Sequence, residues 1–419
     1  MRFVNISRFP DYLCPMKKLF FLLVALGASL GVQAQWGCPD PQATNYSASA
    51  TQNNGSCLYL PTNYTMPVRA TLDSLVYEIS GLVYWNGKLY GHGDSGNPNR
   101  LYELDTTTGA ITKKIILGTK ANIDWEDITQ SNTHFFVADV GNNLGTRQDL
   151  VVYKFPKALL NSPDSVLTIP DNQIESLFFS WEDQTTFSSN SNTPFDCEAI
   201  AWRNNKLHLF TKNHLNNGPC VHYTIPDTAG TYQAKKRDSL NTGNMMITAA
   251  DFAANKQLML TGYNIISGEI VLWYIYDFSS DDSCFIMGNK RKINVGTFST
   301  NGQVEGICFT DTTGGFACNE KFITVAPARL YRFKTTPWYP YVYPNAIDEI
   351  SDNAATGYTW NGQQIELLAP GRLQVYTLNG QLVGSASNVG LPLPVTPGVY
   401  IIQWQEAGKK VQREKRMLR

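Results

Sequence analysis

The 419-residue sequence predicts an all-β fold built from repeated units. Charged residues are sparse at 16%, whereas aromatic residues reach 12%, and this composition favours sheets over solvated helices. Long stretches of helical periodicity are absent, and Asn, Gly and Thr recur between short apolar runs, as expected for strands joined by turns. Similar segments also recur along residues 64–337. Together these three observations predict a β-propeller in this part of the chain.

Each repeat starts with a polar residue, runs through a strand and a tight turn, and returns along a second strand. Residues 80–90 (SGLVYWNGKLY) align with residues 198–208 (EAIAWRNNKLH) without a gap. The five repeats are aligned at Ser80, Glu126, Glu198, Ala249 and Glu305. Third strands are expected at residues 100–105, 150–155, 220–225, 270–276 and 329–333.

The spacing of the repeats predicts five blades, because a four-stranded blade takes ~40–45 residues. The interval from Glu126 to Glu198 is longer and contains a loop at residues 160–173. Six blades is the alternative, if that loop hides further strands. The fifth repeat has no fourth strand after Phe333, and residues 67–73 can supply it. Such pairing would close the ring and remove exposed sheet edges.

Acidic and hydroxyl side chains mark the repeat starts. Because residues two apart in a strand point to the same side, these groups would converge on a central channel, where clustered carboxylates need a cation to ionise together. The sequence therefore predicts a Ca²⁺ site. The first-choice ligands are Ser80, Glu126, Glu198 and Glu305, and the second layer is Glu78, Asp124 and Asp196. The alternative is that these acids accept backbone N–H groups between blades and bind no metal.

The second strands end in polar residues that would line the same mouth of the propeller. The expected ligand-binding residues are His92, Asn97, Asn142, Asn143, Asn213, Tyr263, Asn264 and Asn319. If the mouth is catalytic, the candidates are Asp94, Asp139, Lys212 and Glu320. Arg147 and Lys321 could join Lys212 in meeting an anionic group. Several of the asparagines could equally do no more than shape turns.

The stretch Glu78–Tyr90, with Glu126, Glu198 and Glu305-Gly-Ile, resembles calcium-activated apyrases. That resemblance implies five blades, a central calcium and hydrolysis of nucleoside diphosphates. The chain departs from the pattern in the fourth repeat, at Thr248 and Ala249. The blade starts also resemble phytase-like esterase propellers. Two functions follow: a propeller that binds a glycan, peptide or small molecule, and, as the alternative, a calcium-dependent hydrolase of phosphate or ester bonds.

The N-terminus reads as a secretory signal peptide within residues 1–35, with Lys17-Lys18 before an apolar run at residues 19–32. Met16 is then the expected initiator, unless residues 1–15 form a long basic region. Export permits disulfides. Cys38 and Cys57 are expected to pair within a module at residues 36–63, which resembles short Cys-bracketed, Asp/Asn-rich modules of secreted proteins. A Cys308–Cys318 cross-strand bridge is also expected, and the pairing of Cys197, Cys220 and Cys284 stays open.

After a linker at residues 338–346, residues 347–419 resemble the C-terminal sorting domain of type IX secretion cargo, through residues 373–383, residues 397–402 and a basic end. The resemblance implies a small β-sandwich, recognition by that secretion machinery, and a protein secreted or held on the outer-membrane surface of a Gram-negative bacterium. The net charge of −1 argues against a nucleic-acid surface. A monomer without a transmembrane segment is expected.

Overall fold

The computed structural model divides into two compact units, which meet in sequence at Tyr339 and Pro340. It describes residues 35–339 except 213–217, 255, 279–280 and 323–325. In the second unit it describes residues 358–418 except 361–363, 369, 378–381, 388–392, 395–397 and 408–411. The predicted signal peptide and linker therefore lie almost wholly outside the described residues. None of the described helices is long and apolar enough to cross a membrane.

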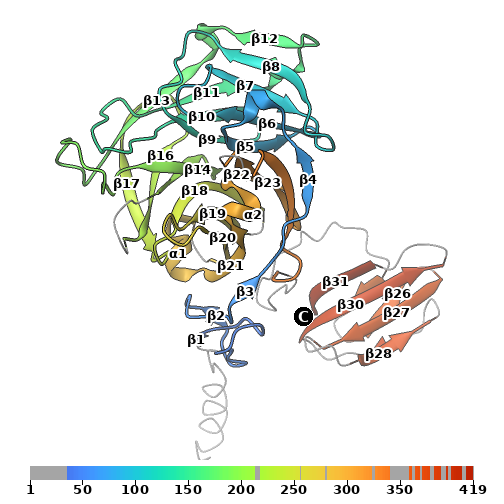
Figure 1. Ribbon diagram of the computed structural model, residues 1–419. Helices are drawn as coiled ribbons and strands as arrows, with labels where there is room; N and C mark the ends of the chain where they lie inside the picture. Colours follow the sequence, from blue (N-terminus) through green and yellow to red (C-terminus); the bar gives the residue numbers. More distant parts are fainter. Residues whose placement is uncertain are drawn as a thin grey trace, which may run out of the picture. The chain divides into compact units, whose positions relative to one another are not determined.

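The first unit contains, among its described residues, five four-stranded antiparallel meanders arranged like the blades of a β-propeller (Figure 1). The first is β5 (Ile79–Trp85), β6 (Lys88–Gly93), β7 (Arg100–Leu104) and β8 (Ile111–Leu117). The second is β9 (Trp125–Gln130), β10 (His134–Asp139), β11 (Val151–Pro156) and β13 (Glu175–Trp181). The third is β14 (Cys197–Arg203), β15 (Lys206–Thr211), β16 (Cys220–Pro226) and β17 (Gly230–Leu240).

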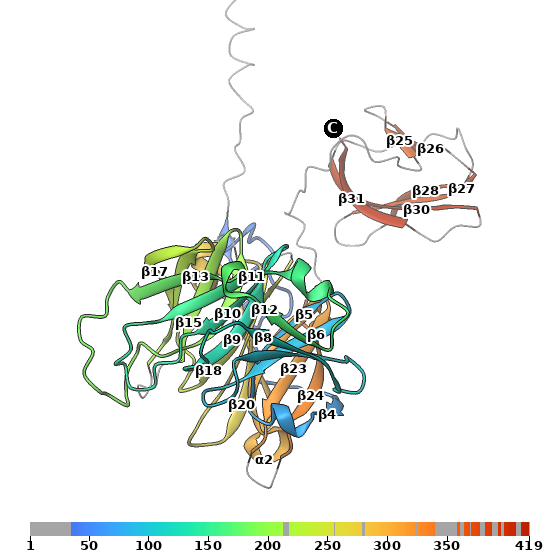
Figure 2. The same cartoon turned by 90° about the horizontal axis from the view of Figure 1, so that it is seen from above.

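The fourth meander is β18 (Met246–Ala253), β19 (Gln257–Tyr263), β20 (Glu269–Tyr276) and β21 (Asn289–Thr297). The fifth is β22 (Gln303–Asp311), β23 (Gly314–Glu320) and β24 (Arg329–Lys334), completed by β4 (Val68–Thr71) from before the first repeat. Figure 2 shows β4 beside β24. The expected pairing between the two ends of the repeat region is thus confirmed.

The first strands of the meanders contact one another in a ring, in the order β5, β9, β14, β18, β22 and back to β5. An apolar cluster fills each interface between neighbouring meanders. Burial of these five clusters is the main stabilising term for such an arrangement. The first hairpins turn tightly because Asn86-Gly87 and Asn204-Asn205 adopt the positive φ angles that a type I′ turn requires.

The long interval between the second and third repeats contains one strand of its own, β12 (Val166–Ile169). It pairs in parallel with β8 and so widens the first sheet. The second and third meanders are also joined, because β13 pairs in parallel with β17 to form one eight-stranded sheet.

Register in the fourth repeat differs from the prediction by one residue. In four repeats the inner hairpin contains a bulge, and the extra residue is Glu126, Glu198, Thr248 or Glu305. The corresponding irregularity in the first repeat spans Ser80 and Gly81. Thr248, not Ala249, therefore occupies the position of the glutamates. We call this place in each repeat the bulge position.

Cysteine pairing is confirmed at one pair and wrong at the other. Cys38 and Cys57 form a disulfide. Cys308 and Cys318 do not, because the register places Cys308 opposite Phe316 and Cys318 opposite Gly306. A second bulge between Phe309 and Asp311 shifts the strands relative to the symmetric count from the turn.

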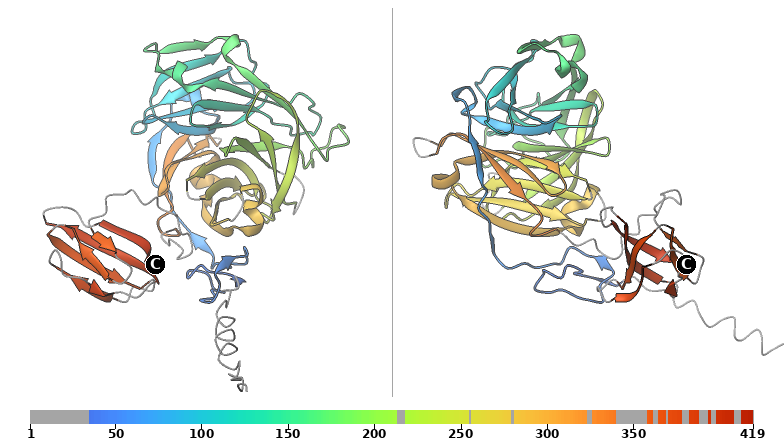
Figure 3. Two further views of the ribbon diagram at one scale, coloured as in Figure 1. Left: turned by 180° about the vertical axis from the view of Figure 1, so that it is seen from behind. Right: turned by 90° about the vertical axis from the view of Figure 1, so that its right-hand side faces the viewer.

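The N-terminal module packs on the fourth meander, beside β21 (Figure 3), where β3 (Thr62–Asn63) pairs with that strand. It also contains β1 (Trp36–Gly37) and β2 (Gln52–Asn53). The Asp40 carboxylate accepts hydrogen bonds from the hydroxyls of Tyr59 at 2.7 Å and Tyr276 at 2.5 Å. Asn53 donates to the Asp277 carbonyl oxygen and the Asn289 side chain. These oxygen-bearing residues thus hold the module against the meander.

Short helical turns connect several of these strands: η2 (Ser74–Val76), η3 (Lys157–Asn161), η4 (Asp171–Gln173), η5 (Asp281–Ser283), α1 (Cys284–Met287) and α2 (Phe298–Asn301). The second unit contains two sheets. One is β25 (Tyr358–Trp360), β26 (Gln364–Leu367) and β29 (Leu393–Pro394), and the other is β28 (Leu382–Ala386), β27 (Gly371–Tyr376), β30 (Gly398–Glu406) and β31 (Gln412–Leu418). Residues of both sheets share one apolar core, which includes Tyr358 and Trp404.

Candidate functional site

The bulge positions lie near the start of each first strand, and their acidic side chains gather at one end of the strand ring. Glu126, Glu198 and Glu305 are all buried. Burial, together with the neighbouring carboxylates, raises the pKa of Glu126 well above its usual value. Burial and the charge of Glu320 raise the pKa of Glu305 to about 8. We call this end, with the loops that follow the second strands, the acidic mouth.

Three carboxylates of the acidic mouth lie close enough to share one cation. Asp94, Asp124 and Glu126 each place one oxygen within 4.8 Å of the others. Gly141 makes this approach possible, since a Cβ atom there would collide with the carboxylates of both Glu126 and Asp124. Burial and the charge of Asp94 raise the pKa of Asp124 to about 6. An all-oxygen, anionic set of this kind fits Ca²⁺, with the remaining positions left for water.

The other predicted metal ligands have partners of their own. The Ser80 hydroxyl donates a 2.5 Å hydrogen bond to the backbone carbonyl of Glu126. The Asp196 carboxylate accepts from the backbone N–H of Asn142 at 2.6 Å. Glu78 is exposed and accepts from the Asn97 side chain at 2.8 Å. These three residues thus frame the mouth and lie outside the Asp94–Asp124–Glu126 cluster.

Lys212 enters the acidic mouth as an internal cation. It is buried, forms an ion pair with Glu198, and places its ammonium 5.7 Å from the centre of the Tyr263 ring. Burial opposes its charge, but the anionic neighbours, Glu198 foremost, raise the pKa of Lys212 well above its usual value. The sequence placed Lys212 at this mouth without showing that it neutralises one of the predicted metal ligands.

Several predicted ligand-binding residues form internal bonds. His92 is fully buried against Trp125, and burial lowers its pKa to about 4. The buried Asn142 side chain donates to the Phe195 carbonyl oxygen and accepts from the Arg147 N–H, and the buried Asn319 side chain likewise bonds backbone groups. Asn264 accepts from two N–H groups of its turn. Asn143 is exposed, and Asn213 lies outside the described residues.

Two of the predicted catalytic carboxylates differ in surroundings. Asp139 is buried and pairs with Arg147 at 2.9 Å, while its second oxygen has no hydrogen bond within the described part of the chain. Glu320 is half-buried, and burial with the charges of Asp94 and Glu78 raises its pKa to about 8. Lys321 lies outside this group, with its ammonium 4.5 Å from the centre of the exposed Tyr77 ring.

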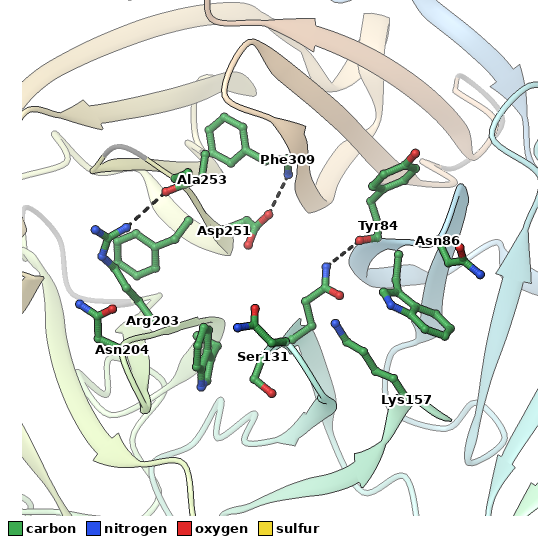
Figure 4. Close-up of a pocket in the computed structure, with 15 residues that line it drawn as sticks. Tyr84, Asn86, Ser131, Lys157, Arg203, Asn204, Asp251, Ala253 and Phe309 are labelled. Atoms are coloured by element: carbon green, nitrogen blue, oxygen red, sulfur yellow. Dashed lines mark hydrogen bonds between the residues drawn. The ribbon is translucent and has the colours of Figure 1, made fainter. Parts of the chain in front are cut away.

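A second ring was not predicted and lies at the other end of the first strands. Four residues beyond the bulge position, the repeats carry Tyr84, Gln130, Trp202, Phe252 and Phe309. All five line a cavity of about 630 Å³ (Figure 4). The signal in the sequence is an aromatic residue just before the first turn in four of the five repeats. We call this end the aromatic mouth.

Comparison with known proteins gave matches only among solved structures. No family model and no curated protein matches the chain. The PQQ-bound aldose sugar dehydrogenase of Streptomyces coelicolor is 9% identical, with a TM-score of 0.36 over 64% of this chain and 96% of that one. Regucalcin, a calcium-binding protein from Agrobacterium tumefaciens, is 10% identical, with a TM-score of 0.36 over 65% and 95%. An α-L-arabinanase of Penicillium chrysogenum is 10% identical, with a TM-score of 0.35 over 85% and 99%. Sequence identities and TM-scores this low transfer neither a ligand nor a reaction to this chain.

Proposed function

We propose that this chain is a secreted or cell-surface, five-bladed, calcium-binding β-propeller that binds an extracellular ligand at its acidic mouth. Five blades are supported by the five meanders, by the ring of first strands and by the pairing of β4 with β24. A sixth blade is disfavoured because β12 extends the first sheet.

The observation that carries the calcium proposal is the cluster of Asp94, Asp124 and Glu126 around Gly141. Three carboxylates this close repel one another, so a divalent cation would stabilise their ionised forms. These three side chains would hold the ion, and when bound the ion supplies positive charge that can attract an anionic or hydroxyl-rich ligand. Asn97, Glu320 and Tyr263 lie near the mouth and would contact a glycan, peptide or small molecule there.

Export and sorting are proposed from the two ends of the chain. A signal peptide at residues 1–35 and a C-terminal sorting domain at residues 347–419 would take the propeller through the type IX machinery. The two sheets and the shared core of the second unit support a small β-sandwich for that domain. The destination would be the outer-membrane surface or the medium of a Gram-negative bacterium, with the chain a monomer.

A calcium-dependent hydrolase of phosphate or ester bonds is the second candidate. The specific observation in its favour is that Glu305 and Glu320 have pKa values raised to about 8, in the range where a carboxyl group can exchange protons at neutral pH. Asp139 or Asp94 could position a water molecule, and Lys212 could meet an anionic substrate.

A calorimetric calcium titration of the EDTA-stripped chain tests the first proposal. We expect roughly one tight ion per chain, lost in Glu126→Gln and kept in the control Glu182→Gln, whose carboxylate pairs with Lys235 outside the mouth. Calcium binding that survives in Glu126→Gln would disprove the site. A screen of phosphate and ester substrates, with and without calcium, then separates binding from hydrolysis.

A further inference from the structure

The aromatic mouth combines side chains that ordinary blade packing does not require. Tyr84, Trp202 and Phe252 are half-buried and line the cavity, so part of each ring surface is open to it. The Trp202 indole is held in place by a 2.7 Å hydrogen bond from Nε1 to the Asp227 carboxylate. Fixed, partly open aromatic faces are platforms on which the C–H face of a sugar or another flat group can stack.

A lysine lies in the wall of the same cavity. Lys157, at the start of η3, is 5% exposed, and its ammonium lies 5.8 Å from the centre of the Trp85 ring and 5.4 Å from that of Phe135. No described residue gives its Nζ atom a hydrogen bond or an ion pair. An ammonium held against two aromatic rings is partly desolvated, and an incoming anion would relieve that cost.

Two cations and one carboxyl group line the cavity. The Arg203 guanidinium is already engaged, since it donates to the Ala253 carbonyl oxygen at 3.3 Å and lies over the Phe252 ring. Figure 4 places Lys157 and Asp251 on different sides of the cavity. Asp251 accepts a 2.7 Å hydrogen bond from the backbone N–H of Phe309 and so belongs to the wall. Since a carboxylate on the ligand would avoid Asp251, the anionic group of a bound molecule belongs at the Lys157 side.

Amide side chains surround the aromatic faces. Gln130 lines the cavity and donates from Nε2 to the Tyr84 carbonyl at 2.6 Å, so its own carbonyl oxygen can accept from a ligand. Asn86, Asn132 and Asn204 stand at the rim, at the same place in three repeats, and all are exposed. Asn86 also forms a type I′ turn, but its amide can still bond hydroxyl groups.

We propose that the aromatic mouth binds an acidic saccharide, with a sugar ring stacked on Trp202 or Tyr84 and its carboxylate on Lys157. A uronic acid residue would need aromatic rings for its C–H face, amides for its hydroxyl groups and a cation for its carboxylate, and the aromatic mouth offers all three. This site goes beyond the calcium-dependent function proposed above, because it lies at the other end of the strands and uses none of the calcium ligands.

Titration of the full chain with trigalacturonate in EDTA, followed by calorimetry, tests this proposal independently of the calcium site. We expect binding by the unaltered protein, at least tenfold weaker binding by Lys157→Met, and weaker binding of a neutral galactose trisaccharide. The matched control is Lys154→Met, which removes a nearby lysine that pairs with Glu175 at 2.9 Å and does not line the cavity. That variant should bind trigalacturonate as the unaltered protein does.

Three results would overturn the proposal. The first is no binding of trigalacturonate by the folded, unaltered chain. The second is equal affinity in Lys157→Met, with a thermal melt showing that the variant is folded. The third is binding of benzoate as tight as that of the uronate, which would show that the cavity recognises an aromatic anion and not a sugar.

Discussion

The carboxylate of Asp127 accepts a 2.9 Å hydrogen bond from the backbone N–H of Ile200, which lies in the next repeat of the chain. The same oxygen accepts from Ala250 in the repeat after that, at 3.3 Å, and the other oxygen accepts from Ile128. Asp127 is fully buried and directly follows Glu126. One side chain therefore ties three first strands together between the acidic and aromatic mouths.

Removing this tie should destabilise the propeller. Asp127→Ala leaves buried N–H groups of Ile200 and Ala250 without an acceptor, and we expect a loss of about 2–4 kcal/mol in the free energy of unfolding. Asp127→Asn keeps one acceptor oxygen and should lose less. Urea denaturation measures both, with the exposed Asp164→Ala as control. Equal stability of Asp127→Ala and Asp164→Ala would contradict this role.

The close approach at Gly141 can be tested without removing any calcium ligand. In Gly141→Ala the added Cβ must displace the carboxylates of Glu126 and Asp124, so we expect calcium affinity to fall by tenfold or more. The measurement is the calorimetric titration described above. Gly243→Ala controls for general backbone strain, since a Cβ there meets no atom within 4 Å while the φ of 65° disfavours alanine. Unchanged affinity in Gly141→Ala would remove Glu126 and Asp124 from the site.

Lys212 should weaken calcium binding in the unaltered protein, because its charge already offsets part of the acidic mouth. Lys212→Met frees Glu198 and makes the mouth more negative, so we expect calcium affinity to rise about tenfold. The calcium-free variant should also melt at a lower temperature, since buried carboxylates lose their counter-charge. Lys321→Met, which removes a lysine on Tyr77, is the control. A lower calcium affinity in Lys212→Met would contradict this account.

Much of the repeat structure was predictable because it is local. The alternation of apolar residues and the Asn-rich turns defined the first hairpins, and residues 67–73 could be assigned to ring closure because the fifth repeat ended early. The bulges were not predictable in this way. A bulge moves one residue out of register without changing the apolar pattern enough to be seen. The fourth repeat was therefore aligned one residue late, at Ala249, and a disulfide was expected between Cys308 and Cys318, which are both free thiols.

The sequence predicted which residues lie at the acidic mouth, but not which of them contact one another. Acidic residues at the repeat starts predicted that Glu126, Glu198 and Glu305 lie together. The ion pair of Lys212 with Glu198 and the proximity of Asp94 to Asp124 depend on the folded loops and have no signal in the sequence. The aromatic mouth was missed because Tyr84, Trp202 and Phe252 read as ordinary strand residues when each repeat is considered alone. Lys157 was missed because it follows the third strand of its repeat, in η3, where the sequences of the repeats do not align.

The cysteine assignment gives a direct chemical test of the second bulge. We expect alkylation of the unfolded, unreduced chain, prepared without residues 1–35, to label five cysteines, namely Cys197, Cys220, Cys284, Cys308 and Cys318. Reduction should add Cys38 and Cys57. All five thiols are buried, so the folded protein should be labelled slowly. Intact-mass spectrometry counts the labels, and only three before reduction would indicate a second disulfide.

Stability of the calcium-free protein should fall as the pH rises from about 5 to 9. Burial and neighbouring charges raise the pKa values of Glu305 and Glu320 to about 8, against 4.5 for an ordinary glutamate. Between pH 4.5 and pH 8 the folded state binds more protons than the unfolded state. The free energy of unfolding is therefore highest below pH 4.5 and decreases as the pH rises through 8. Urea denaturation in EDTA at pH 5.5 and 8.5 measures the loss. Glu305→Gln, which cannot ionise, should show a smaller loss. Calcium should add stability at pH 8.5 by binding the folded state at Asp94, Asp124 and Glu126. Stability that rises with pH in EDTA would contradict the raised pKa values.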